Sequence, residues 1–212
     1  MSKTQGSGLQ AFTSVSGIAV PFAQANVDTD QIVPALYLQK PRAADFGAFL
    51  FRDVRHDAQG ARRADFPLND PAFAQARILV AGRNFGCGSS REHAVWALAD
   101  GGFRAVIAPS FGDIFFSNAL KNGLLPVRLP EPRVEALLGL LQREPGARIR
   151  IDLAAQRVHA GDGGCDEFEI DPFARHCLLE GLDELDYTLG QSGRIAAFER
   201  ERASSLSPIP SA

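Results

Sequence analysis

The chain has 212 residues, of which 45% are hydrophobic and 22% charged, and its formal net charge is −3. These values predict one domain with a single hydrophobic core and argue against a nucleic-acid partner, which would need a broad basic surface. The first residues lack a basic-then-apolar signal pattern, and no apolar run approaches bilayer length. We therefore expect no membrane partner and a cytoplasmic location.

The first part of the chain alternates between polar and apolar segments. Residues 1–14 are polar and Gly/Ser-bearing, so we expect a flexible lead, and residues 15–22 read as a strand. Asn26-Val27-Asp28-Thr29-Asp30 is a run of side chains that bond locally, as in a tight loop. We expect one domain over residues 15–200 and a disordered tail over residues 201–212.

Residues 39–71 mix Pro, Gly, Asp and Arg without a sustained period. A long irregular stretch inside a domain is usually a functional or disordered loop, so we expect a mobile loop here. Its apolar patch, residues 46–51, has two equal interpretations. It belongs to the core, or it forms a surface for a partner.

A strand, a glycine-bearing loop, a helix and a second strand are predicted over residues 77–109. Residues 78–81 form a short apolar run, and three glycines follow where the backbone must turn. Ser89 and Glu92 have the spacing of a capping box, which predicts a helix starting at Ser89. Gly101-Gly102 would end that helix before a strand at residues 103–108, giving a βαβ unit.

The loop before this helix has two readings. It is an anion site that carries a nucleophile or base, with Arg91 as a bidentate donor, or Ser89 is only a helix cap. On spacing alone the cap is favoured, because a serine hydroxyl is a weak base unless its anion is stabilised. The loop lacks the third glycine of a dinucleotide fingerprint and the G-x-S-x-G order of an esterase.

The remaining elements predict an α/β fold whose strand order stays open. A helix capped by Ser110 should run to Asn122, and a strand should follow at residues 124–129. Apolar residues at helical spacing predict a helix over residues 131–143. Three short antiparallel strands and a last helix, opened by Asp171-Pro172 and closed by Gly181, are expected at residues 148–153, 157–160, 166–170 and 171–181.

Cysteines and histidines give little evidence of a metal site. Cys87, Cys165 and Cys177 lack C-x-x-C spacing, which argues against a disulfide framework and against an iron–sulfur or zinc site within this chain. Whether Cys87 is reactive or merely buried stays open. His93 has either a structural role or a place at the site, and the other three histidines have no partner at metal-ligand spacing.

Three motifs carry a resemblance to a known family. They are NVDTDQIVP at residues 26–34, NFGCGSSREHA at 84–94 and APSFGDIFFSNALKNGLLPV at 108–127. Together they resemble the small subunits of bacterial 3-isopropylmalate dehydratase (isopropylmalate isomerase), which correspond to the swivel domain of aconitase. The resemblance covers residues 17–187 and implies a single swivelling β/β/α domain.

The resemblance also implies roles for individual residues. Ser89 would be the catalytic base, acting as an alkoxide. Substrate carboxylates would be held by Ser90, Arg91 and Arg42, and Asp30 would lie at the active site. Tyr37 and Leu38 would face the variable substituent of the substrate, for which apolar side chains suit an isopropyl group. The resemblance implies no metal ligand in this chain.

The reaction implied is dehydration and rehydration of a hydroxy diacid, which interconverts 2-isopropylmalate and 3-isopropylmalate through 2-isopropylmaleate in leucine biosynthesis. A 4Fe-4S cluster would be expected on a partner large subunit, without which this chain would be inactive. Two alternatives remain: a subunit of a related hydro-lyase acting on homoaconitate, citraconate or a similar diacid, and a catalytically silent binding module of the same fold.

Overall fold

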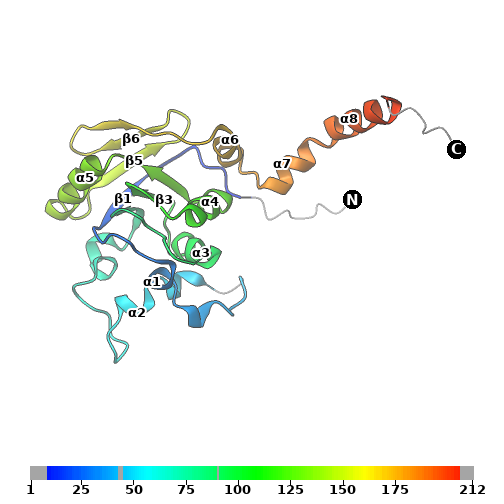
Figure 1. Cartoon of the computed structure of the whole chain (residues 1–212). Helices are drawn as coiled ribbons and strands as arrows, with labels where there is room; N and C mark the ends of the chain where they lie inside the picture. Colours follow the sequence, from blue (N-terminus) through cyan, green and yellow to red (C-terminus); the bar gives the residue numbers. More distant parts are fainter. Residues whose placement is uncertain (1–8, 43–44, 90, 206–212) are drawn as a thin grey trace.

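A seven-stranded mixed sheet forms the centre of the molecule (Figure 1). The computed structural model describes residues 9–42, 45–89 and 91–205. The strand order is β4-β3-β2-β1-β5-β6-β7. The strands are β1 (Ser14–Phe22), β2 (Ala76–Ala81), β3 (Ala105–Ala108), β4 (Leu125–Arg128), β5 (Arg148–Asp152), β6 (Arg157–Ala160) and β7 (Cys165–Glu167).

Strand β1 divides the sheet into two halves. On one side β1 to β4 are parallel, with Val20 opposite Leu79 and Val80 opposite Ile107. On the other side β1 pairs antiparallel with β5, and β6 and β7 continue that antiparallel half. The late antiparallel group expected from the sequence is therefore confirmed, and it extends the parallel sheet instead of standing apart.

Helices cover both faces of the parallel half. The main helices are α3 (Glu92–Asp100), α4 (Asp113–Lys121), α5 (Glu131–Arg143) and α6 (Pro172–Glu180). Strand residues of alternating parity pack against α3 and α4 on one face and against α5 and α6 on the other. The α5 side chains expected in the core, among them Leu137 and Leu141, are buried. This layered arrangement confirms the α/β prediction.

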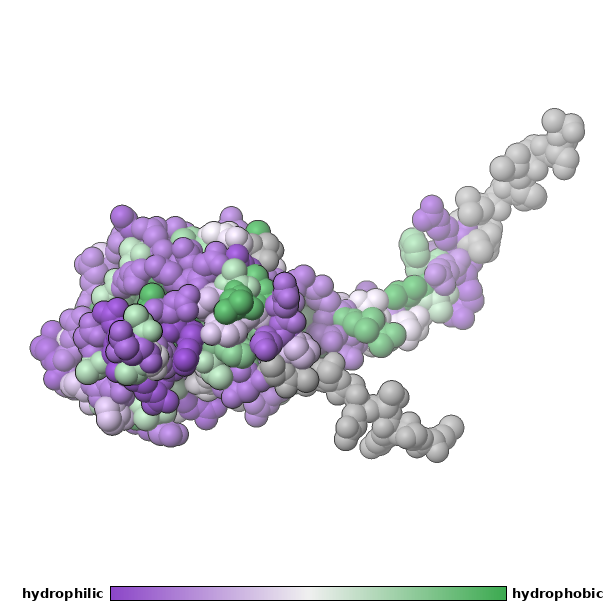
Figure 2. Space-filling model, turned by 90° about the horizontal axis from the view of Figure 1, so that it is seen from below, coloured by the Kyte–Doolittle hydropathy of each residue, from purple (hydrophilic) through white to green (hydrophobic). Residues whose placement is uncertain are grey.

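The remaining helices are short or lie at the C-terminus. They are α1 (Thr29–Ile32), α2 (Arg52–Arg55), α7 (Glu184–Gly190) and α8 (Ser192–Ser205), with 3₁₀ turns η1 (Ala35–Tyr37), η2 (Phe46–Phe49), η3 (Pro67–Asn69) and η4 (Pro71–Phe73). Helices α7 and α8 form an arm that extends from the body (Figure 1). Apolar residues gather along this arm (Figure 2), where Leu185, Leu189 and Phe198 are exposed.

The predicted ends of helix α6 are correct, but the predicted start of helix α4 is not. Asp171 caps α6 by accepting a hydrogen bond from the Ala174 N–H at 2.9 Å, and Gly181 ends it in the left-handed region at φ 69°, as expected. The predicted Ser110 cap is wrong. Helix α4 begins after Gly112, and the Ser110 hydroxyl accepts from the Asn84 N–H at 2.9 Å.

Two segments expected to be flexible contain packed residues. Phe12 is only 1% exposed, and its N–H donates to the Leu178 carbonyl at 2.8 Å. Within residues 39–71, Phe46, Leu50 and Phe51 are buried, so the apolar patch belongs to the core. Residues 201–205 continue α8, and the rest of the predicted tail lies outside the described residues. Of the helices described, none is long and apolar enough to cross a bilayer.

Candidate active site

Three loops meet beyond the carboxyl ends of strands β1, β2 and β3, which is where open α/β sheets place their ligand sites. Asp28 pairs with Cys87, and Phe85 with Phe111, in single parallel bridges that continue the strand order of the sheet. The Thr29 N–H donates to the Cys87 carbonyl at 2.9 Å. The motifs at residues 26–34 and 84–94 are thus adjacent, as the resemblance implies.

Two asparagines and two glycines allow these loops to approach so closely. Asn26 and Asn84 adopt left-handed backbone angles, φ 55° and 58°, and the Asn84 side-chain amide donates to the Asn26 oxygen at 2.8 Å. A Cβ added to Gly112 would lie 2.5 Å from the Gly86 carbonyl oxygen. The crossing therefore requires a residue without a side chain at position 112.

Ser89 lies exposed at the end of this loop, before helix α3 begins. The predicted capping box is wrong, since α3 starts at Glu92 and no side chain caps its first turn. The Ser89 carbonyl accepts a hydrogen bond from the Thr29 hydroxyl at 3.1 Å, which holds this residue in the loop. The Glu92 carboxylate accepts instead from the Asn122 side chain at 2.7 Å. Ser89 is consequently not used as a helix cap.

Arg91 forms an ion pair with Asp30 from helix α1. The Arg91 side chain is 16% exposed and that of Asp30 is 51% exposed, so the pair lies at the mouth of the site. Arg91 also occupies the N-cap position of α3, where backbone N–H groups lack intrahelical partners. The structure brings together Ser89, Arg91 and Asp30 of the predicted set. Ser90 lies outside the described residues.

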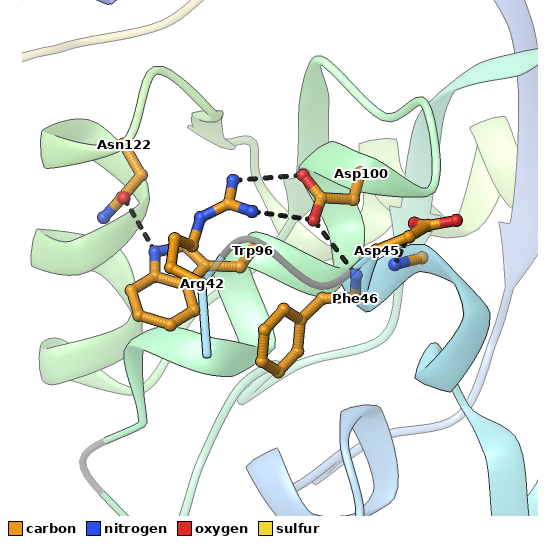
Figure 3. A network of polar contacts seen from close by, with 7 residues as sticks. Arg42, Asp45, Phe46, Trp96, Asp100 and Asn122 are labelled. Carbon is orange, nitrogen blue, oxygen red and sulfur yellow. Dashed lines mark hydrogen bonds and ion pairs between the residues drawn. The ribbon is translucent and has the colours of Figure 1, made fainter. Parts of the chain in front are cut away.

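Arg42 lies at the other end of helix α3. Its guanidinium makes two hydrogen bonds to the Asp100 carboxylate, at 2.9 and 3.1 Å, and lies 5.2 Å from the Trp96 ring centroid (Figure 3). Asp100 is the last residue of α3, and Arg91 lies just before its first residue. The rise of the helix therefore separates Asp100 from Arg91 by roughly 13 Å. The structure therefore does not bring Arg42 together with Ser89.

The segment predicted to face the substituent follows directly after α1. The Tyr37 ring stacks on Phe49 at a centroid distance of 4.2 Å, and Leu38 is half-buried. Leu36, which sequence reasoning did not single out, is 81% exposed. Its position in the apolar run that follows α1 was the only available signal.

Two residues of the run at 26–30, expected to bond locally, organise the site. Thr29, 1% exposed, is the one polar residue that is buried in the described part of the chain. Asp28 caps α1 by accepting from the Gln31 N–H at 2.7 Å. Burial and the Asp28 carboxylate both raise the pKa of the Cys87 thiol. This shift favours the inert reading of Cys87, because the thiolate is the reactive form.

The described residues do not fit an iron–sulfur cluster. Cys87 lies in the site loop, Cys165 is exposed on β7, and Cys177 is buried in α6. Nor does any group of three or more His, Cys, Asp or Glu side chains in these residues lie close enough together to hold a metal ion. His93 packs against Phe46 and Trp96, with ring centroids 5.4 and 4.6 Å away.

Comparison with known proteins decides the family. The model of the aconitase C-terminal domain matches residues 9–132, and a second model, LeuD_N, matches residues 135–172. The 3-isopropylmalate dehydratase small subunit of Paramagnetospirillum magneticum is 49% identical, and the match covers 93% of this chain and 98% of that protein. The chain belongs to the 3-isopropylmalate dehydratase small-subunit family. This family is part of the aconitase group of hydro-lyases, as the motifs predicted.

Further members of the small-subunit family agree. The 3-isopropylmalate dehydratase small subunit of Rhodospirillum centenum is 52% identical over 90% of this chain and 94% of its own length. The crystal structure of 3-isopropylmalate dehydratase from Methanocaldococcus jannaschii superposes with a TM-score of 0.62 at 28% identity, covering 88% of this chain and 99% of that chain. The predicted swivel-type domain is thereby confirmed.

Proposed function

We propose that this chain is the small subunit of a 3-isopropylmalate dehydratase, which interconverts 2-isopropylmalate and 3-isopropylmalate through 2-isopropylmaleate in leucine biosynthesis. One observation carries the proposal: the loops of residues 26–34 and 84–94 meet, and they place Ser89, Arg91 and Asp30 at one end of helix α3. The name of its relatives supports the same substrate.

Ser89 acts on the carbon-bound proton of the substrate. A serine alkoxide is a strong enough base only where positive charge stabilises it. The N-terminus of the nine-residue helix α3 and the Arg91 guanidinium supply that charge. Arg91 also binds a substrate carboxylate, and Asp30 orients Arg91 for it. Ser90 is assigned to the same carboxylate.

The departing hydroxyl group requires a Lewis acid. A 4Fe-4S cluster on a large subunit would provide it, since the described residues of this chain offer no ligand group. The exposed apolar residues of the α7–α8 arm support a protein partner, because such side chains are normally covered in an assembled complex. The working enzyme is then a heterodimer of this chain and a large subunit.

Arg42 keeps its assignment to a substrate carboxylate as a proposal. In the isolated chain its guanidinium is neutralised by Asp100. To bind the substrate, Arg42 would have to leave the Asp100 carboxylate and pair with a carboxylate of the substrate. Tyr37 and Leu38 would contact the isopropyl group. A cytoplasmic location and the absence of nucleic-acid and membrane partners also stay predictions.

The test is reconstitution with a large subunit whose cluster is loaded. The Ser89→Ala variant should lose about 10³-fold in kcat, the contribution typical of a general base, while it still copurifies with the large subunit. Ser16→Ala, which changes an exposed serine on β1, should retain full activity. Turnover by this chain alone, or full activity of Ser89→Ala, would contradict the proposal and favour the binding-module reading.

Substrate identity needs a separate measurement. The reconstituted pair should be assayed with 2-isopropylmalate, homoaconitate and citraconate. We expect the highest kcat/KM with 2-isopropylmalate, because Tyr37 and Leu36 place apolar surface near α1. A higher kcat/KM for another diacid would move the assignment to a related hydro-lyase.

A further inference from the structure

The Asp100 carboxylate at the end of α3 holds two positions of the preceding loop at once (Figure 3). Both of its oxygens accept from Arg42, and one also accepts from the Phe46 N–H at 3.1 Å. The Asp100 side chain is 20% exposed, whereas that of Arg42 is 50% exposed. Asp100 is thus the more buried partner, and its hydrogen bonds hold both Arg42 and Phe46 at the end of α3.

A chain of ring contacts leads from this anchor to Tyr37. The Phe46 ring is fully buried and packs edge-on against Trp96 of α3 at 5.5 Å. Phe46 also meets Phe49 at 5.7 Å, and Phe49 stacks on Tyr37 at 4.2 Å with an interplanar angle of 11°. Displacement of Phe46 would therefore be passed on to Tyr37 through packed side chains.

The backbone fits the helix end with little free space. A Cβ added to Gly47 would lie 2.8 Å from the Asp100 carbonyl group, so η2 rests directly on the last turn of α3. The Cβ of any other residue at position 101 would lie 2.8 Å from the Leu50 side chain. These close approaches fix where residues 46–50 sit, and Asp100 adds the hydrogen bonds that hold them there.

The same helix face reaches back to the active site. Glu92, Trp96 and Asp100 are four residues apart and share one stripe of α3. The Asn122 side chain joins two of them, because its oxygen accepts from Trp96 Nε1 at 3.0 Å and its amide donates to Glu92 at 2.7 Å. One rigid helix therefore carries Arg91 at its start and the anchor of the Tyr37 segment at its end.

We propose that Asp100 is a positioning residue that sets the preference of the enzyme for the apolar substituent of its substrate. Through the hydrogen bond that it accepts from the Phe46 N–H, which does not depend on Arg42, it fixes residues 46–49, and these hold the Tyr37 ring beside the substituent. Asp100 touches neither substrate nor reacting atoms. The inference rests on the proposed function, since it assumes that residues 37–38 face the substrate.

The main test compares two substrates in the reconstituted enzyme. In Asp100→Asn, an NH2 group replaces one of the two oxygens that accept hydrogen bonds from Arg42. This group is itself a donor, so it repels the Arg42 N–H group that faces it. We expect kcat/KM for 2-isopropylmalate to fall about fivefold, mainly through KM, and kcat/KM for a 2-methylmalate to change less than about twofold. Asp65→Asn, which removes an exposed ion pair with Arg63 in the same region, should leave the ratio unchanged. An equal loss for both substrates would overturn the inference.

Fluorescence tests the anchor without any activity. Trp96 is the only tryptophan in the sequence, and it contacts both Arg42 and Phe46. In the isolated chain, Asp100→Asn should shift its emission and increase quenching by acrylamide, whereas Asp65→Asn should not. Unchanged emission and quenching would overturn the anchoring role. Failure of the wild-type pair to convert 2-isopropylmalate would instead refute the proposed function, and the fluorescence result would stand apart from it.

Discussion

The Arg91 guanidinium pairs with the Asp30 carboxylate, although the two residues are 61 positions apart in the sequence. The pair joins helix α1 to the N-cap of α3, and Ser89 precedes Arg91 by two residues at the end of the loop. Arg91 is the more buried partner, and we infer that the ion pair fixes the direction of its guanidinium more than it stabilises the fold.

Removal of Asp30 should therefore affect catalysis more than stability. In Asp30→Ala, Arg91 loses the group that orients it. We expect kcat/KM to fall about tenfold, because a misplaced Arg91 guanidinium binds the substrate carboxylate less well in the transition state. The free energy of unfolding should fall by no more than about 1 kcal/mol, as is typical of exposed ion pairs. Steady-state kinetics and urea unfolding check the two values. A stability loss large enough to explain the activity loss would refute the orienting role.

Gly86 should tolerate no side chain. Its φ is +71°, and an added Cβ would lie 2.2 Å from Phe115 Cγ. Gly86→Ala should cost about 3 kcal/mol in the free energy of unfolding, because steric overlap adds to backbone strain. Gly163 has a similar φ of +79° with open space around its Cβ position, so Gly163→Ala isolates the strain and should cost about 1 kcal/mol. Equal losses in urea unfolding would show that the contact with Phe115 is unimportant.

Cysteine alkylation should distinguish the three thiols. Cys165 is exposed, whereas burial raises the pKa of Cys177 and, with the help of Asp28, that of Cys87. Iodoacetamide at neutral pH should modify Cys165 first, because its thiol is accessible, whereas burial of the other two disfavours their reactive thiolate form. Asp28→Asn keeps an oxygen to cap α1 but removes a negative charge, so it should lower the pKa of Cys87 and speed its alkylation. Mass spectrometry of each peptide over time gives the rates. Faster reaction of Cys87 than of Cys165 in the unmodified chain would contradict this.

The hairpin of β6 and β7 should show a pH-dependent contribution to stability. Hydrogen bonds from Arg133 and from the Gly164 N–H hold the pKa of Asp162 below its usual value. Because the pKa is lower in the folded chain than in the unfolded chain, the stabilisation is complete above the unfolded pKa and is lost as pH falls through the folded one.

Asp162→Asn should accordingly lower the free energy of unfolding by about 1 kcal/mol at pH 7, discounted for partial exposure. The difference from the wild-type chain should shrink below about pH 4, where the carboxyl begins to take up protons. Urea unfolding at a series of pH values measures it. Glu135→Gln, at an exposed position of α5, serves as the control, and an Asp162→Asn difference that does not depend on pH would argue against the linkage.

Local patterns predicted most of the elements. The apolar run of β2 and the helical spacing in α5 encode burial directly, and Asp171 with Gly181 marks both ends of α6. The caps at Ser89 and Ser110 failed because tertiary partners occupy these residues: Thr29 bonds the Ser89 carbonyl, and Asn84 bonds the Ser110 hydroxyl. A capping motif competes with such partners, and they are invisible in a sequence window.

The site was predicted in part. The resemblance of the motifs assigned Asp30, Ser89 and Arg91 to one site, and the structure places all three on adjoining loops, while their roles stay a prediction. The partner of Arg42 could not be predicted, because its pairing with Asp100 depends on how η2 docks on the end of α3. That docking depends on the close approach of Gly47 to the backbone of Asp100, and no sequence pattern predicts this contact.

The position of β1 has a consequence for the synthesis of the chain. One of its edges can pair with β2 early, but the other is covered only by β5, which the ribosome delivers much later. Until then the nascent chain presents bare backbone donors and acceptors to its surroundings. A fragment that stops before residue 148 should consequently self-associate, whereas one that includes β5, β6 and β7 should stay dispersed.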